Sequence, residues 1–92
     1  MKGKWIVTDP DTNQEMLQLS GNKFLFKEDR LDPETREIFV YESTIDLSEY
    51  TREQMFEDVE SFGYSFHEMC NWIDSGESVS LIAECIFEME GI

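Results

Sequence analysis

Residues 51–76 read TREQMFEDVESFGYSFHEMCNWIDSG, and this stretch predicts two short amphipathic helices joined at a glycine. Thr51 is followed three residues later by Gln54, and Ser65 by Glu68. Both pairs match the capping box, in which each side chain accepts a hydrogen bond from the other residue's backbone N–H. The two helix starts are therefore predicted at these positions.

Glycines and apolar spacing predict the ends and inner faces of these helices. Gly63 and Gly76 stand where a left-handed residue commonly ends a helix. Apolar residues recur at intervals of three and four, so each helix has one face suited to a core. We expect burial against the sheet for Phe56, Phe62, Phe66, Met69 and Ile73, together with Val40 and Leu81.

The residues before the helices predict strands. β-Branched and aromatic residues are concentrated in four ranges that are separated by turn-forming residues: 4–8, 15–19, 23–27 and 37–46. A hairpin is predicted at 20–22, and a loop at 28–36. The last range is the longest and carries Ile38, Phe39 and Val40 in succession, which predicts a central strand buried on both sides.

The apolar pattern of residues 78–90 fits both the two-residue period of a strand and the 3.6-residue period of a helix. As a strand, this segment places six apolar residues on one face: Val79, Leu81, Ala83, Cys85, Phe87 and Met89. As a helix, it gathers an apolar stripe but leaves Phe87 outside it. The complete alternation favours the strand. The sequence therefore predicts one α+β domain over residues 1–92, an antiparallel sheet of about five strands in the order β-β-β-β-α-α-β, with two helices packed on one face.

The charge of the chain is large and uneven. The net charge is −14, yet residues 1–36 carry only −1, because six basic residues balance most of seven acidic ones. Residues 37–92 hold fourteen acidic residues and one basic residue, Arg52. Such a field repels nucleic acid and anionic membrane surfaces and favours cationic partners. We expect neither direct nucleic-acid binding nor a membrane association, and no secretory signal is evident.

Patterns for catalysis and for metal binding are missing. His67, the one histidine, falls on the polar side of its helix, and Cys70 and Cys85 are expected to be reduced core thiols. The stretch 9–13 has oxygen ligands at alternate positions, but Gln14 stands where a calcium loop needs glycine. We therefore expect no enzyme, no catalytic residue, no metal site and no cofactor.

One helix face carries the strongest functional signal. Glu53, Glu57 and Glu60 share the side of the first helix that is opposite its apolar face, and Asp58 flanks them. Like charges at this spacing destabilise a helix, and lysines would have relieved the strain. The alternatives are a solvated face and a surface that presents carboxylates in place of phosphates. On the second hypothesis the partner-binding residues are Glu53, Glu57, Asp58 and Glu60, extended by Glu42, Asp46 and Glu49.

Two segments carry a resemblance. The pattern Phe62-Gly63-Tyr64-Ser65 and the later run 81–88 (LIAECIFE) resemble short proteins of phages and conjugative elements of Gram-positive bacteria. In size and charge the chain is similar to anti-CRISPR and anti-restriction inhibitors, several of which mimic DNA. This resemblance implies a cytoplasmic inhibitor, in a bacterial host cell, of a basic nucleic-acid-binding protein such as a CRISPR effector or restriction enzyme. The alternatives are an immunity protein against a nuclease toxin and an assembly module that acts through oligomerisation.

Overall fold

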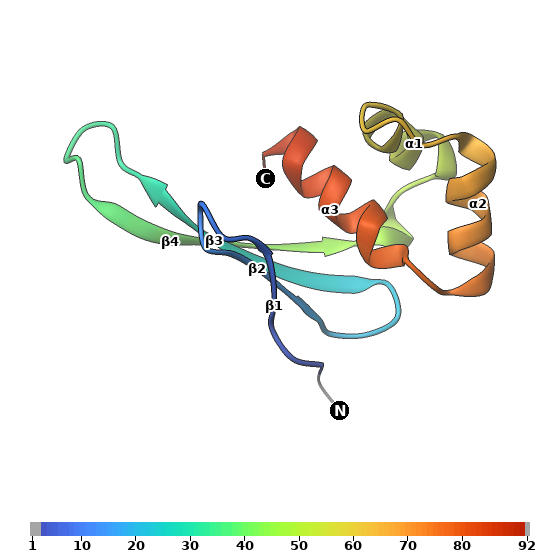
Figure 1. Cartoon of the computed structure of the whole chain (residues 1–92), viewed down its shortest axis with the longest axis horizontal. Helices are drawn as coiled ribbons and strands as arrows, with labels where there is room; N and C mark the ends of the chain where they lie inside the picture. The colour runs from blue at the N-terminus through green and yellow to red at the C-terminus, as the bar shows by residue number, and fades with distance from the viewer. Residues whose placement is uncertain (1–2, 92) are drawn as a thin grey trace.

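The computed structural model describes residues 3–91 and shows a sheet with helices on one side (Figure 1). The strands are β1 (Ile6–Asp9), β2 (Gln14–Gln18), β3 (Lys23–Leu31) and β4 (Ile38–Asp46). After a short 3-10 turn, η1 (Leu47–Glu49), follow the helices α1 (Arg52–Glu60), α2 (Phe66–Ser75) and α3 (Val79–Glu90). Within the described range the protein is therefore α+β, with a four-stranded antiparallel sheet and three helices.

The sheet is a meander in which every strand pairs with its neighbour in sequence, in the order β1-β2-β3-β4. The predicted hairpin at residues 20–22 is confirmed, since the Leu19 backbone N–H donates to the Lys23 carbonyl at 2.8 Å. Phe24 lies opposite Ile45, and Phe26 lies opposite Met16. These four side chains are buried. Because successive side chains alternate between the two faces of a strand, the residues between them point to the open face of the sheet.

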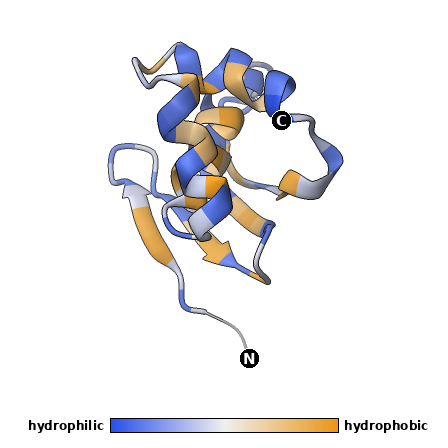
Figure 2. Cartoon of the chain, turned by 90° about the vertical axis from the view of Figure 1, so that its right-hand side faces the viewer, coloured by the Kyte–Doolittle hydropathy of each residue, from blue (hydrophilic) through white to orange (hydrophobic). Residues whose placement is uncertain are grey.

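α3 lies against the buried face of the sheet, and α1 and α2 pack beside α3 (Figures 1 and 2). α3 contacts both β3 and β4 below it and α1 beside it. Phe87 of α3 stacks on Phe26, with ring centroids 4.6 Å apart and planes 8° from parallel. None of the helices within residues 3–91 combines the length and apolar character that a bilayer crossing requires.

The fifth predicted strand is wrong, because residues 79–90 form α3. The alternation was misleading because this helix is apolar on more than one side. Ile82 and Ile86 are fully buried, and Phe87, which lay outside the simple stripe, is buried on the sheet. A helix that contacts a sheet on one side and another helix on the next needs a wide apolar surface.

Both predicted capping boxes are confirmed, for Thr51 with Gln54 and for Ser65 with Glu68. The prediction that Phe62 and Phe66 are core residues is wrong, since they are 47% and 41% exposed. Phe62 comes two residues after the last residue of α1, and Phe66 is the first residue of α2. The buried apolar faces of α1 and α2 therefore do not include Phe62 and Phe66. Met69 is buried as predicted, while Phe56, Ile73 and Leu81 are only partly buried.

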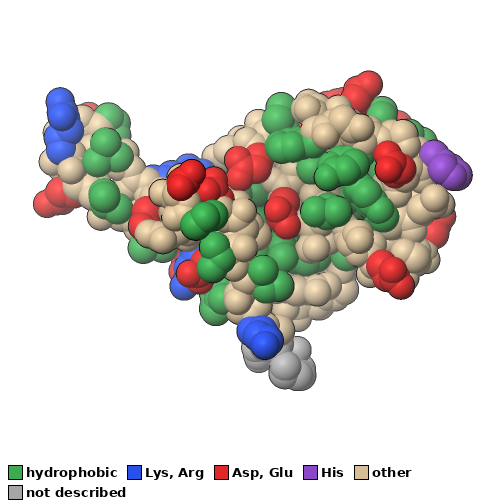
Figure 3. Space-filling model, in the orientation of Figure 1, with side chains coloured by type: hydrophobic (Ala, Val, Ile, Leu, Met, Phe, Trp, Pro, Cys, Tyr) green, Lys and Arg blue, Asp and Glu red, His purple; other side chains and the backbone are tan. Residues whose placement is uncertain are grey.

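The end of the β3–β4 hairpin projects from the body, and we call residues 30–40 the arm (Figures 1 and 3). The predicted central position of β4 is wrong, because it is an edge strand of the sheet. Consequently Ile38 and Val40, which were expected in a core, are 70% and 59% exposed. The predicted loop at 28–36 begins later than expected, since β3 continues to Leu31.

Candidate acidic interaction surface

The acidic row, which we define as Glu53, Glu57 and Glu60, lies on the outer face of α1. All three side chains are exposed, whereas Met55 and Val59 on the opposite face are buried. The capping box at Thr51 fixes where the helix begins and so fixes which residues point outward. An α-helix rises about 6 Å over four residues, which is the separation of Glu53 and Glu57 along the axis. Nucleotides two steps apart on one DNA strand are separated by a similar distance along its axis, roughly 7 Å.

The one basic residue of the acidic half is already engaged. Arg52 Nη2 donates to Asp74 Oδ1 at 2.7 Å and ties α1 to α2. The other two ion pairs within residues 3–91 join Lys27 to Glu15 and Arg30 to Glu28, and neither involves α1. The acidic row therefore presents its carboxylates to solvent without a cation of its own in the described part of the chain.

Two of the three predicted extension residues, Asp46 and Glu49, lie in the segment that directly precedes α1. Asp46 caps η1 by accepting hydrogen bonds from the backbone N–H and hydroxyl of Ser48, and these bonds lower its pKa below the ordinary value. Glu49 is exposed in the same turn. Glu42 lies opposite Lys27 on the open face of the sheet, because Ile45 marks the covered face and the pleat alternates. Glu42 is thus not part of the helical surface.

Asp58 was expected to flank the acidic row, but it is only 8% exposed and faces Glu90 of α3. Burial raises its pKa to about 7, and the neighbouring Glu90 and Glu57 add to the shift. When Asp58 and Glu90 are both ionised, neither carboxylate can donate a hydrogen bond. Asp58 Oδ2 then has no hydrogen-bond partner. A proton on Asp58 supplies the missing donor toward Glu90. Asp58 therefore links α1 to α3 and is not available to a partner.

Replacing Asp58 by Asn is expected to raise the melting temperature near pH 8 and to change it little near pH 4. The pKa of Asp58 in the folded protein lies above the ordinary 3.8, so protonated Asp58 contributes its full stabilisation below pH 3.8. This contribution is lost as the pH rises through about 7. Each kcal/mol shifts the melting temperature of a domain this small by roughly 4–8 °C. Melts followed by circular dichroism at both pH values measure the effect.

The matched control for Asp58→Asn is Glu53→Gln, which removes the same charge from an exposed position of the same helix that does not contribute to the Asp58 pKa shift. Its effect on the melting temperature should be small and similar at both pH values. If Asp58→Asn and Glu53→Gln show the same pH dependence, then the contact between the carboxyl groups of Asp58 and Glu90 does not exist in solution.

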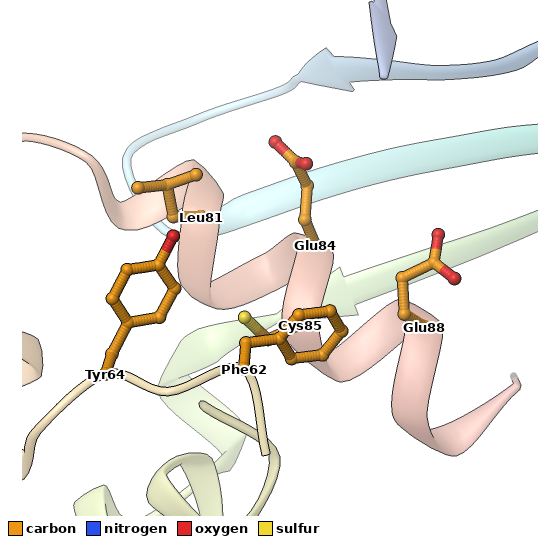
Figure 4. Close-up of a pocket in the computed structure, with 6 residues that line it drawn as sticks. All are labelled: Phe62, Tyr64, Leu81, Glu84, Cys85 and Glu88. Atoms are coloured by element: carbon orange, nitrogen blue, oxygen red, sulfur yellow. The ribbon is translucent and has the colours of Figure 1, made fainter. Parts of the chain in front are cut away.

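A pocket of about 110 Å³ opens beside α3, and we call it the aromatic–acidic pocket (Figure 4). Its lining consists of two rings from the α1–α2 connection and four residues of α3: Phe62, Tyr64, Leu81, Glu84, Cys85 and Glu88. Glu84 and Glu88 extend from successive turns of the helix toward the same side (Figure 4). Sequence reasoning missed this site because it placed Phe62 in the core and residues 84–88 on a strand.

Local structure holds the walls of this pocket in place. Gly63 adopts φ of 91°, a left-handed conformation that glycine reaches without strain, and it separates the two lining rings. Tyr64 packs edge-on against Trp72 with centroids 5.0 Å apart. The Gln14 side chain, which is buried, donates to Glu88 Oε2 at 2.7 Å. The Tyr64 ring and the Glu88 carboxylate are therefore held by contacts behind the pocket.

The electrostatics of α3 disfavour nucleophilic chemistry in this pocket. Burial, aided by the negative field of Glu84, raises the pKa of Cys85 to about 11, so its thiol stays protonated at neutral pH. The pKa of Glu84 is also raised, first by its burial and then by Glu88. Within residues 3–91 no three His, Cys, Asp or Glu side chains gather as a metal site would require. Cys85 is therefore a poor nucleophile at neutral pH.

Comparison of the chain with known protein families, with curated protein sequences and with solved structures found no match.

Proposed function

We propose that the protein is a non-enzymatic inhibitor that binds a basic, nucleic-acid-binding surface of another protein through the acidic face of α1. The proposed binding residues are Glu53, Glu57 and Glu60, with Asp46 and Glu49 before them. Their carboxylates take the place of phosphates and accept hydrogen bonds from arginine and lysine side chains. The protein is an inhibitor of the anti-CRISPR or anti-restriction kind in this proposal.

One observation carries this proposal. Residues 37–92 hold fourteen acidic residues and one basic residue, and that residue, Arg52, is bound to Asp74. A folded surface with this imbalance repels itself, so its acidic residues reduce stability and contribute little to folding. A cationic partner removes the repulsion and releases its own bound anions. The same negative field repels the phosphate backbones of DNA and RNA, so the proposal includes no direct contact with either.

The experiment uses the full chain immobilised on a resin and a bacterial lysate treated with nuclease. We expect it to retain a nucleic-acid-binding protein, whose affinity falls steeply between about 0.1 M and 0.5 M salt and which added duplex DNA displaces. An affinity that is flat over this salt range, or a complex that DNA does not displace, contradicts the proposal.

A second candidate function, assembly through self-association, is favoured by the arm. Leu31, Ile38, Phe39 and Val40 are all exposed on it, and β4 has an unpaired edge. Exposed apolar edge strands add a strand from another chain. The net charge of −14 opposes contact between two helical bodies, but the arm projects away from them. Residues 30–40 hold two basic and three acidic residues, so two copies can approach there with less repulsion than between their helical bodies.

Under this second function, replacing Ile38 and Val40 by Lys is expected to convert a dimer into a monomer. Both side chains are largely exposed, so the melting temperature of the monomeric form should change little. Light scattering coupled to size exclusion measures the mass. A wild-type chain that is monomeric at the highest soluble concentration rules out assembly through the arm.

A further inference from the structure

The aromatic–acidic pocket has features that the acidic row lacks. Two aromatic rings, Phe62 and Tyr64, face a helix that carries two carboxylates, Glu84 and Glu88, at its edge (Figure 4). We infer that this pocket receives the side chain of an arginine from the partner protein. The inference rests on the proposed function, because it names the chemical group of the same basic partner that enters this hollow.

No lysine or arginine within residues 3–91 pairs with the two carboxylates of the pocket. Glu84 is partly buried, and within residues 3–91 it forms neither an ion pair nor a hydrogen bond. A carboxylate that is partly shielded from water and has no partner is stabilised when a cation approaches it. The raised pKa of Glu84, caused by burial and by Glu88, agrees with this uncompensated state. The described chain supplies no lysine or arginine to this site.

The shape and size of the pocket favour a single side chain. A volume of about 110 Å³ is well below the roughly 300–1,000 Å³ of pockets that hold drug-sized ligands. Glu84 and Glu88 are four residues apart and so about 6 Å apart along α3. A planar guanidinium carries five donors, so its edge can donate to a carboxylate while its face lies on an aromatic ring. An ammonium group stacks less well and has a tighter hydration shell, so arginine fits better than lysine.

The protein already binds one of its own arginines with the same groups. The guanidinium carbon of Arg30 lies 3.8 Å from the centroid of the Tyr41 ring, and its Nε donates to Glu28 at 2.8 Å. Gln14 connects this internal site to the pocket, because its amide donates to both Glu28 and Glu88. Glu88 is thus held in a fixed orientation before any partner arrives, which lowers the entropy lost on binding.

The test uses N-acetyl-arginine amide as the probe and amide shifts of the full chain in two-dimensional NMR as the readout. We expect saturable shifts confined to residues 62–64 and 84–88. N-acetyl-lysine amide should bind several-fold more weakly, since it lacks the planar stacking group. Phe62→Ala should weaken arginine binding roughly two- to fivefold, because the ring contributes a cation–π contact.

The decisive variant is Glu84→Gln with Glu88→Gln, which keeps the shape of the pocket and a carbonyl oxygen for Gln14. It should weaken arginine binding by about tenfold. The matched control is Glu53→Gln with Glu57→Gln, two carboxylates at the same helical spacing without aromatic neighbours in a pocket. The inference is overturned if both pairs weaken binding equally, if lysine binds as well as arginine, or if the shifts spread over all acidic residues.

Failure of the pocket and failure of the proposed function give different results. If the lysate experiment yields a partner that DNA displaces, and the Glu84→Gln/Glu88→Gln chain binds that partner like the wild type, the arginine site is wrong while the inhibitor proposal stands. If the arginine probe binds the pocket but no basic partner is retained, the inhibitor proposal is wrong while the pocket's preference for arginine stands.

Discussion

Replacing Phe26 by Ala is expected to remove a large part of the free energy of unfolding of the protein. Phe26 is fully buried and stacks on Phe87, so its removal leaves a cavity between β3 and α3. Truncation of a buried phenylalanine destabilises by about 3–5 kcal/mol. The total stability of small domains is about 5–15 kcal/mol, so this loss is a large part of it. Urea unfolding followed by circular dichroism measures the free energy of unfolding.

Phe62→Ala serves as the control, since it removes the same ring from a position that is 47% exposed. Its effect on the free energy of unfolding should stay within about 0.5 kcal/mol of zero. This reverses the expectation from helical spacing, which placed Phe62 in the core. If the Phe62 variant loses as much stability as the Phe26 variant, the chain does not pack with α3 against β3 as described.

Reversing the acidic row, with Lys in place of Glu53, Glu57 and Glu60, is expected to abolish inhibition while the fold is kept. All three side chains are exposed, and Lys near the end of α1 suits the negative end of the helix dipole. Each new lysine then meets a lysine or arginine of the partner, and such like-charge contacts cost several kcal/mol. We expect the affinity for the retained partner to fall at least about a hundredfold, measured by titration calorimetry beside a melting curve.

A second triple variant separates a defined surface from a diffuse field. Lys in place of Asp11, Glu34 and Glu37 changes the net charge by the same amount, at exposed positions outside the helices. Its affinity should stay close to that of the wild type. Equal losses from the two variants would mean that the overall charge of the protein does the binding and that the acidic row has no special role.

Local signals predicted much of this fold. The capping boxes at Thr51 and Ser65 and the left-handed glycines at 63 and 76 depend on a few adjacent residues, so the sequence reveals them directly. All four predicted strands overlap observed ones for the same reason. The exposure of the acidic row also follows, because it is set by where α1 begins. Each of these features is decided within one or two helical turns or one hairpin.

Features decided by distant contacts were not predictable in the same way. The period of residues 79–90 was ambiguous because α3 has neighbours on two sides, which only the assembled fold reveals. The apolar run at 38–40 looked central, yet it lies on an edge, since composition does not distinguish a core from a projecting arm. Asp58 looked like a member of the acidic row until α3 was placed against it. The aromatic–acidic pocket needs the same placement of α3.

The order of the strands and the position of α3 determine the order in which parts of the fold can form during synthesis on the ribosome. The four strands pair only with neighbours in sequence, so the sheet can form as its residues emerge. Its apolar face, with Phe24 and Phe26, stays uncovered until residues 79–90 have left the exit tunnel. During that interval the nascent chain exposes the surface on which Phe87 later stacks, and chaperones that bind apolar segments compete with α3 for it.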